Sequence, residues 1–183
     1  MTKPKAGPAE VLRAALALLL ICAAAAGALA GVNAVTKAPI AANAEKEAGV
    51  ARRLLFPGAA VTEKALGANA YYEARSAEGE LLGYVIDTAA QGYGGEVRFS
   101  VGLSAEGKVL ALRVLAADGE TPGLGQKIKE TSFLDQFRNA EKAVALGGGI
   151  DGVASATFSS RAAVEAVNQA FALFEQIQKG GVS

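Results

Sequence analysis

Residues 96–115 read EVRFSVGLSAEGKVLALRVL, and they predict two strands joined by a short turn. Apolar side chains occupy every second position from Val97 to Leu103. Because successive side chains of a strand point to opposite faces, this alternation marks one buried face of a sheet. The tetrapeptide SAEG at 104–107 ends in glycine, which tolerates the positive φ that a four-residue hairpin loop often needs. The stretch therefore predicts an antiparallel hairpin.

The same tetrapeptide joins a second pair of segments that resemble strands. SAEG recurs at 76–79, between YYEAR at 71–75 and LLGYVI at 81–86. Short β-prone runs separated by a loop of this length are typical of a hairpin. We therefore expect two antiparallel hairpins, which together provide most of one sheet.

Helical patterns lie before and after these hairpins. Residues 41–55 are rich in Ala, Glu, Lys and Arg, and 132–139 resemble a short helix. Residues 143–146 are read as a strand that three glycines end. Residues 161–178 give the clearest helix of the soluble part, because their apolar positions recur at spacings of three and four. Those positions are Val164, Val167, Phe171, Phe174 and Ile177. The order predicts an α+β domain of antiparallel hairpins flanked by helices.

The composition narrows the possible chemistry. The 183 residues include no His, which excludes a His-dependent triad, a His-ligated metal site and a His general base. Eighteen basic residues balance 18 acidic ones without a basic run, which argues against nucleic-acid binding. The single cysteine, Cys22, excludes an internal disulfide. Carboxylates, hydroxyls or a bound cofactor must therefore carry any chemistry.

The N-terminal segment predicts a membrane anchor. No charged residue occurs from 14 to 36, and a helix of this length spans roughly 35 Å, enough to cross a hydrocarbon core of about 30 Å. We therefore divide the chain into a short cytoplasmic tail (1–13), a transmembrane helix (14–36), a juxtamembrane helix (37–58) and a folded domain (59–183).

Two alternatives to a retained anchor remain open, and the orientation is finely balanced. Residues 28–30 (ALA) resemble a signal-peptide cleavage site, although the apolar run exceeds a signal core of roughly 7–15 residues. A lipoprotein site at Cys22 is disfavoured, because Ile21 stands where a small residue is wanted. A short basic tail favours a cytoplasmic N-terminus, although the charge count on the two sides is close to a tie. The basic residues are Lys3, Lys5 and Arg13 before the segment and Lys37, Lys46, Arg52 and Arg53 after it.

The segment that bears most on function precedes the last helix. Residues 151–160 read DGVASATFSS, a loop of small residues that leads into a helix N-terminus. Unpaired backbone N–H groups and the helix dipole attract an anion at such a position. The hydroxyls of Thr157, Ser159 and Ser160 are possible donors, and one of them can become an ester oxygen. The simpler interpretation is that Ser159 or Ser160 only caps the helix.

This segment resembles the flavinylation motif of the FMN-binding domain family, Asp-x-x-Ser/Thr-Gly-Ala-Thr, whose final Thr takes FMN through a phosphoester. Asp151, Ala156 and Thr157 fall on matching positions. The sequence departs at two: Ala154 replaces the usual hydroxyl residue, and Ser155 replaces the usual Gly. The resemblance implies covalent FMN, attached as a phosphoester to Thr157, and no metal site.

Two further segments extend the resemblance. Residues 120–128 (ETPGLGQKI) resemble a signature of the G subunit of the Rnf electron-transport complex and of its relative, the C subunit of the sodium-pumping NADH:quinone reductase. Residues 92–95 (GYGG) resemble a Gly-Tyr-Gly element of the same family. Taken alone, the first contains a tight turn and the second is a flexible connector. The short chain favours the Rnf-type subunit.

The resemblance implies a set of cofactor-binding residues from all three segments. In residues 92–95 it implies Tyr93 and Gly94, with Tyr93 packing near the cofactor. In residues 120–128 it implies polar contacts from Thr121 and backbone amides and second-line contacts from Gln126 and Lys127, and Glu120 has the alternative of a strand-end charge. In residues 151–160, Asp151 belongs to the sequence that a flavin transferase reads, and its alternative is a solvated loop acid. The complete set is Tyr93, Gly94, Glu120, Thr121, Gly123, Leu124, Gly125, Asp151, Ser155, Ala156, Thr157, Ser159 and Ser160.

The implied function is electron transfer by the flavin, which needs no side-chain base. The implied partners are a Mg-dependent flavin transferase with FAD as donor, and the other Rnf subunits. These move electrons between reduced ferredoxin and NAD while translocating Na⁺ or H⁺. The implied location is the cell (inner) membrane, with residues 59–183 forming an extracytoplasmic FMN-binding domain.

Two other classes of function stay open on the sequence. One is a free-standing membrane flavoprotein for extracellular electron transfer, without Rnf partners. The other is an unmodified binding module, since Ala154 and Ser155 depart from the motif.

Overall fold

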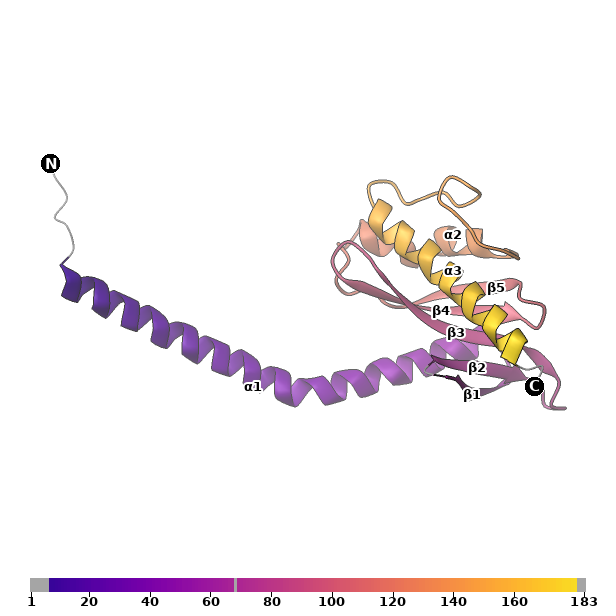
Figure 1. Cartoon of the computed structure of the whole chain (residues 1–183), viewed down its shortest axis with the longest axis horizontal. Helices are drawn as coiled ribbons and strands as arrows, with labels where there is room; N and C mark the ends of the chain where they lie inside the picture. Colours follow the sequence, from indigo (N-terminus) through magenta and orange to yellow (C-terminus); the bar gives the residue numbers. More distant parts are fainter. Residues whose placement is uncertain (1–6, 68, 181–183) are drawn as a thin grey trace. The chain divides into compact units, whose positions relative to one another are not determined.

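The chain begins with one long helix. The computed structural model describes residues 7–67 and 69–180, so Lys3 and Lys5 of the predicted tail lie outside the described residues. Helix α1 (Pro8–Leu55) continues without a break through the predicted anchor into the predicted juxtamembrane helix, and it ends at Leu55 rather than at residue 58 (Figure 1). The chain divides into two compact units, residues 1–43 and 44–183.

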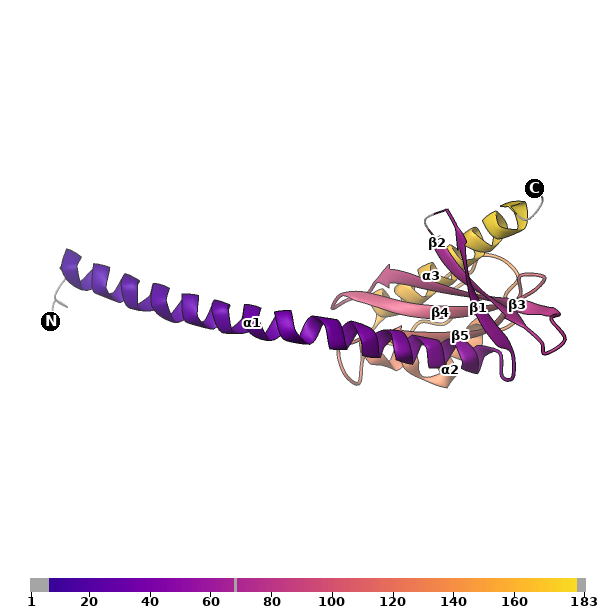
Figure 2. The ribbon, with the colours of Figure 1, turned by 90° about the horizontal axis from the view of Figure 1, so that it is seen from below.

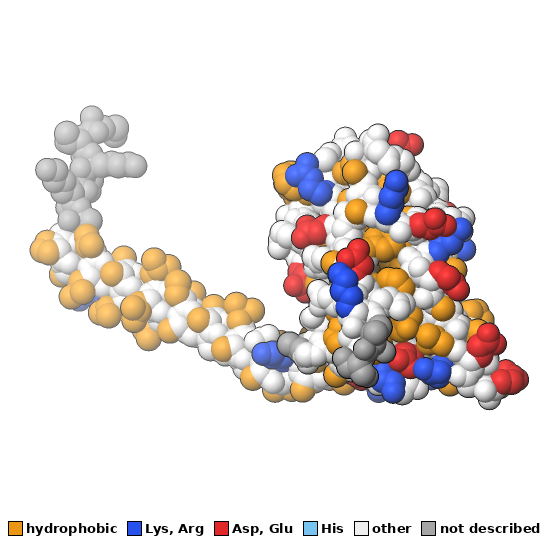
Figure 3. Space-filling view, turned by 45° about the vertical axis from the view of Figure 1, so that its right-hand side comes forward, with side chains coloured by type: hydrophobic (Ala, Val, Ile, Leu, Met, Phe, Trp, Pro, Cys, Tyr) orange, Lys and Arg blue, Asp and Glu red, His pale blue; other side chains and the backbone are white. Residues whose placement is uncertain are grey.

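The first unit has the length and composition of a membrane span. Its leucines and isoleucines are exposed, as Leu20 and Ile21 show with 67% of each accessible. Figure 3 shows hydrophobic side chains along the outside of this helix. A long helix with exposed apolar side chains suits a hydrocarbon surrounding.

The second unit contains a meandering antiparallel sheet. Over the described residues, five strands follow each other in the order β1-β2-β3-β4-β5. Their bounds are β1 Ala60–Leu66, β2 Asn69–Arg75, β3 Leu81–Gln91, β4 Glu96–Ser104 and β5 Val109–Ala116. The two predicted hairpins are thus present, and β3 pairs with β4 to connect them.

The two SAEG tetrapeptides form matching turns. In each, the serine amide donates to the carbonyl of the residue after the glycine at 2.8 Å, and the glycine amide donates to the serine carbonyl at 3.0 Å. Gly79 and Gly107 have φ of +86° and +91°, a region that strongly favours glycine. The repeated tetrapeptide was therefore a sound signal for a turn.

Helix α3 (Thr157–Gly180) covers one face of the sheet (Figures 1 and 2). It packs on β3 and β4, where Val97, Phe99 and Val101 are fully buried, as their alternation predicted. The opposite face is covered by residues 44–55 of α1, and Leu55 packs with Val85 there. The predicted α+β class is confirmed.

A buried arginine fastens residues 44–55 to the sheet. Arg52 donates through Nε to Asp87 at 2.9 Å and through Nη1 to Glu45 at 2.6 Å, and it stacks over the Tyr72 ring at 4.0 Å. The Ser100 hydroxyl donates to the other oxygen of Asp87 at 2.7 Å. Burial alone would lower the pKa of Arg52, but these hydrogen bonds outweigh it and raise that pKa. The end of α1 is therefore part of the folded domain.

The predicted strand at 143–146 is wrong. Only an isolated bridge from Leu146 to Ile150 forms there. The side chain of Asn168 on α3 accepts from the Val144 amide at 2.9 Å and donates to the Val144 carbonyl at 3.0 Å. An amide side chain thus takes the place of a neighbouring strand.

The short elements differ in detail from the prediction. Strand β1 was not predicted, because most of its side chains are exposed and it lacks an alternating apolar pattern. The helix expected at 132–139 is a short α2 (Thr131–Leu134) followed by η2 (Asp135–Phe137), and η1 (Gly125–Lys129) precedes them. Helix α3 begins at Thr157, before the predicted start at 161, which brings Thr157 into its first turn.

Candidate functional site

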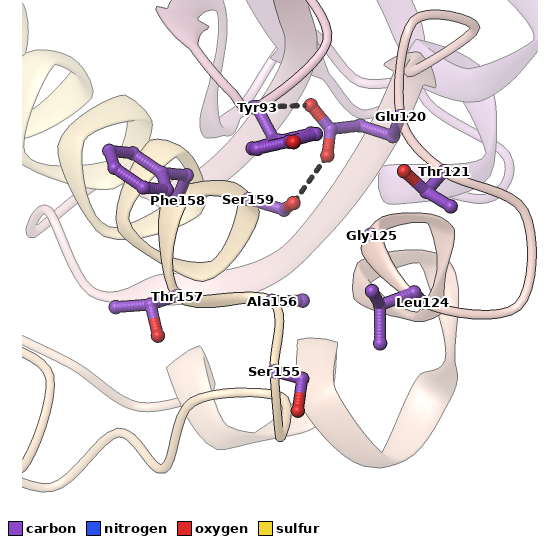
Figure 4. Close-up of a pocket in the computed structure, with 10 residues that line it drawn as sticks. All are labelled: Tyr93, Glu120, Thr121, Leu124, Gly125, Ser155, Ala156, Thr157, Phe158 and Ser159. Atoms are coloured by element: carbon purple, nitrogen blue, oxygen red, sulfur yellow. Dashed lines mark hydrogen bonds between the residues drawn. The ribbon is translucent and has the colours of Figure 1, made fainter.

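Three loops that are far apart in the sequence meet around one cavity. They are the β3–β4 loop, the loop between β5 and η1, and the loop that enters α3 (Figure 4). The cavity has a volume of about 270 Å³. Its walls are formed by Tyr93, Glu120, Thr121, Leu124, Gly125, Ser155, Ala156, Thr157, Phe158 and Ser159. All three segments singled out in the sequence therefore contribute to a single site.

Most of the predicted site residues line this cavity, and four do not. Gly94 and Gly123 belong to the loops but not to the wall. Asp151 is exposed, and its backbone is held by the Gln136 side chain, which accepts from its amide at 2.7 Å. Ser160 lies behind the wall. Of the two second-line candidates, Gln126 and Lys127, neither lines the cavity.

Glu120 joins the three loops. Its side chain is almost completely buried, with 1% of the residue exposed. Oε1 accepts from the amides of Tyr93 at 2.8 Å and Gly94 at 3.2 Å, and Oε2 accepts from the Ser159 hydroxyl. Figure 4 shows the carboxylate between Tyr93 and Ser159. Glu120 is therefore more than the strand-end charge that was its alternative interpretation.

The glycines around Glu120 allow this close approach. A Cβ at Gly92 would lie 2.2 Å from Oε1, and one at Gly125 would lie 2.3 Å from Oε2. A Cβ at Gly94 would lie 1.6 Å from the Gly119 carbonyl oxygen. These distances exclude any larger residue in the present arrangement, so the Gly-rich composition of the loops reflects packing as well as turn geometry.

The loop that enters α3 is held by Ser160. Its hydroxyl accepts from the Val153 amide and donates to the Ala156 carbonyl, both at 2.9 Å. Ser160 therefore fixes the loop from inside the domain, which is a supporting role. The exposed Thr157 is the first residue of α3, where backbone N–H groups lack intrahelical acceptors and the helix dipole favours an anion.

Ser155 has an unusual backbone conformation. Its φ is +60°, a left-handed value that non-glycine residues seldom adopt. The flavinylation motif has glycine at this position, and the turn observed here gives a physical reason for that preference. The departure at Ser155 therefore keeps the geometry of the turn at some cost in backbone energy.

An aromatic pair forms the exposed rim of the cavity. The rings of Tyr93 and Phe158 have centroids 6.3 Å apart, and 72% and 58% of the two residues are exposed. The Arg161 guanidinium lies 5.8 Å from the Phe158 centroid. Phe158 was not predicted as a site residue. It is an aromatic residue outside the apolar stripe of the helix, and this position is a usable signal of a surface role.

The site has the chemical features of a binding site for a planar, phosphate-bearing group. It combines aromatic and aliphatic walls with a hydroxyl at a helix N-terminus. Within residues 7–67 and 69–180, no group of three or more His, Cys, Asp or Glu side chains is placed to hold a metal ion.

The comparison with protein families defines the class of this site. Residues 92–172 match the FMN-binding domain, a range that contains all three loops of the cavity. Residues 1–49 match the RnfG N-terminal region. The fold and the site are thus those of an FMN-binding domain carried on a membrane-anchor helix. The chain is similar to RnfG proteins in its N-terminal region and carries a match to the FMN-binding domain.

Curated relatives agree with this assignment. The G subunit of an ion-translocating oxidoreductase complex from Methanosarcina acetivorans is 27% identical over 88% of this chain and 93% of its own length. The G subunit of a proton-translocating ferredoxin:NAD⁺ oxidoreductase complex from Clostridium ljungdahlii is 30% identical over 64% of this chain and 66% of its own. A Na⁺-translocating counterpart from Acetobacterium woodii is 30% identical over 55% and 53%. The chain thus spans nearly all of the first relative and only about half to two thirds of the other two.

Two solved structures show a distant likeness. NqrC from Shewanella oneidensis has a TM-score of 0.49 with 17% identity over 67% of this chain and 70% of its own. The C subunit of a Na⁺-translocating NADH-quinone reductase from Parabacteroides distasonis has a TM-score of 0.45 with 19% identity over 55% and 58%. Likeness at this level does not bear on function.

Proposed function

We propose that this chain carries FMN on Thr157 and relays electrons within an ion-translocating ferredoxin:NAD⁺ oxidoreductase. The observation that carries the proposal is the exposed threonine in the first turn of α3, beside a cavity within an FMN-binding domain. The proposed electron relay is based on the relatives, of which one is a subunit of a Na⁺-translocating ferredoxin:NAD⁺ oxidoreductase complex and another of a proton-translocating one.

The residues around the cavity fit FMN. Tyr93, Phe158 and Leu124 offer apolar and aromatic surface to a flat ring system, and the α3 N-terminus offers N–H groups to a phosphate. The volume of about 270 Å³ is slightly below the roughly 300–1,000 Å³ of pockets that enclose a ligand, so part of the group stays accessible. Bound FMN supplies the electron-transfer chemistry, and the protein supplies position and electrostatics.

The attachment requires a phosphoester bond at the Thr157 side-chain oxygen. With FAD as donor, the threonine oxygen bonds to the FMN phosphorus, AMP leaves, and the hydroxyl proton is released. A separate flavin transferase is the partner for this step. The exposed Asp151, with its backbone held by Gln136, is available for recognition by that enzyme.

The remaining assignments concern the membrane. Residues 14–36 are the span, the N-terminus is cytoplasmic, and the domain from residue 59 onward, together with residues 44–55 that pack against it, faces the extracytoplasmic side. The other membrane subunits of the complex are the electron-transfer partners. Co-purification of the solubilised chain with those subunits is expected. Isolation as a single chain from cells with an intact complex would favour the free-standing carrier.

Intact mass and in-gel fluorescence test the attachment. We expect the full chain, expressed with a flavin transferase, to gain the mass of FMN less one water and to fluoresce after denaturation. Thr157→Ala should abolish both signals, and Thr157→Ser is the matched control because it keeps a hydroxyl at the same place. A wild-type chain of unmodified mass, or fluorescence that survives in Thr157→Ala, would refute the proposed site.

A further inference from the structure

We propose that Glu120 is a positioning residue that sets both the shape of the flavin site and the reduction potential of the flavin. The inference rests on the proposed function, since it requires FMN at the cavity. Glu120 lines the cavity, and its carboxylate is the buried acid of that wall. It acts through Tyr93 on the β3–β4 loop and through Ser159 in the first turn of α3.

The first part of the inference concerns shape. Tyr93 and Ser159 lie 27 and 39 residues from Glu120 in the sequence, and the carboxylate accepts hydrogen bonds from the Tyr93 amide and the Ser159 hydroxyl. Tyr93 carries one ring of the exposed aromatic pair, and Phe158, next to Ser159, carries the other. The carboxylate thus holds the two ring-bearing segments at a fixed separation. A flat group that contacts this rim depends on that separation.

The second part concerns charge. The Glu120 side chain accepts three hydrogen bonds, two from backbone N–H groups and one from a hydroxyl. This pattern suits the ionised carboxylate, which has only acceptor oxygens. Within the described residues, no Lys or Arg forms an ion pair with Glu120. A buried negative charge in the wall opposes the addition of an electron to a neighbouring group, because charges are screened less in the interior than in water. Glu120 is therefore expected to lower the reduction potential of the flavin.

Glutamine separates the two roles. In Glu120→Gln the amide oxygen can still accept from the Tyr93 and Gly94 amides. The amide nitrogen then faces Ser159, whose hydroxyl can turn from donor to acceptor. The loops stay connected while the charge is removed. Asp118→Asn is the matched control, because it removes the same charge two residues away at an exposed position.

Ser159→Ala provides the opposite change. It removes one donor from the carboxylate and keeps the charge, so the negative charge is less compensated. Loss of charge in Glu120→Gln should raise the potential, and loss of the donor in Ser159→Ala should lower it. General loosening of the site would move both variants in the same direction, so the opposite signs are specific to the electrostatic role.

The test is a spectroelectrochemical titration of the full chain in detergent, carrying covalent FMN. We expect Glu120→Gln to shift the oxidised-to-reduced equilibrium by about tenfold toward reduction, about 59 mV for a one-electron step. Asp118→Asn should leave it within about twofold, because solvent screens an exposed charge. Flavin fluorescence anisotropy should remain high in Glu120→Gln and fall in Glu120→Ala, which releases both loops.

Each outcome decides between the alternatives. Equal potentials for wild type and Glu120→Gln would overturn the inference, as would shifts of the same sign in Glu120→Gln and Ser159→Ala. Low flavin anisotropy in a folded Glu120→Gln variant would mean that the flavin is not held in its pocket. This result would overturn the inference that the glutamine amide, with Ser159 as acceptor, keeps the loops connected. Absence of FMN on the wild-type chain would instead refute the proposed function, so the two failures are distinguishable.

Discussion

Replacing Ser155 by glycine should stabilise the domain, because Ser155 has φ of +60° in the loop that enters α3. A left-handed backbone costs an L-residue roughly 1–2 kcal/mol. Glycine avoids this cost but gains freedom in the unfolded chain, which offsets about 0.4–1 kcal/mol. The net expectation for Ser155→Gly is a gain of about 0.5–1 kcal/mol. That corresponds to an increase in Tm of about 1–4 °C for a chain of this size.

The assay is thermal unfolding of the full chain in detergent, followed by circular dichroism at a β-sheet wavelength. Ser155→Ala is the first control, since it removes the hydroxyl and keeps a side chain that disfavours positive φ. Asn139→Gly is the second control, because Asn139 has φ of +64° and asparagine tolerates this region well. We expect no gain from either control. A Ser155→Gly variant that melts at or below wild type would refute the backbone cost inferred for this turn.

The same substitution has a functional consequence. Ser155→Gly restores the motif residue beside Thr157, so we expect flavinylation by a transferase to proceed at least as fast as in wild type. A slower reaction would show that this chain and its transferase are adapted to serine. Time courses of in-gel fluorescence at equal protein concentration measure this directly.

Further substitutions test the packing of the domain. Arg52→Leu leaves Asp87 without its cation, and we expect a loss of roughly 2–3 kcal/mol in urea unfolding. The pKa of Glu45 is lowered by its hydrogen bond to Arg52, so the contribution of that pair is present above about pH 4.5 and is lost as the pH falls through the folded-state pKa. Urea midpoints measured from pH 3 to pH 7 should show this loss in wild type and not in Glu45→Gln. Thr88→Val should be neutral or stabilising by up to about 1 kcal/mol in the same assay, because the Thr88 hydroxyl is buried without a partner among the described residues. Gly125→Ala places a Cβ 2.3 Å from the buried carboxylate, so we expect a loss of about 1–3 kcal/mol and lower flavin anisotropy.

The hairpins and the last helix were predictable because their signals are local. A turn tetrapeptide with a terminal glycine, and apolar spacings of three and four, are visible within a few residues of sequence. Strand β1 has no such signal, since its side chains are mostly exposed. The strand expected at 143–146 failed because the partner of its backbone is Asn168 on a distant helix. The identity of a hydrogen-bond partner is a long-range property.

The candidate site was likewise predictable only in part. The three loops were found as motifs, and their convergence on one cavity was implied by the resemblance rather than by spacing. The role of Glu120 could not be predicted, because its partners Tyr93 and Ser159 are brought to it by the fold. Ser160 illustrates the converse. Its hydroxyl was predicted to contact the cofactor or to cap the helix, but its partners are Val153 and Ala156 in the loop before α3.

The openness of the cavity gives a physical reason for the proposed covalent attachment of FMN. Pockets that hold a small molecule by contacts alone usually bury roughly 70–90% or more of its surface. Here the volume is about 270 Å³, and the rim residues Tyr93 and Phe158 are 72% and 58% exposed. A flavin in such a site keeps an accessible edge, which electron exchange with a partner requires, but it gains little binding energy from contacts. The proposed phosphoester at Thr157 would remove this conflict, because retention would then depend on a covalent bond and the aromatic rim would have only to orient the ring.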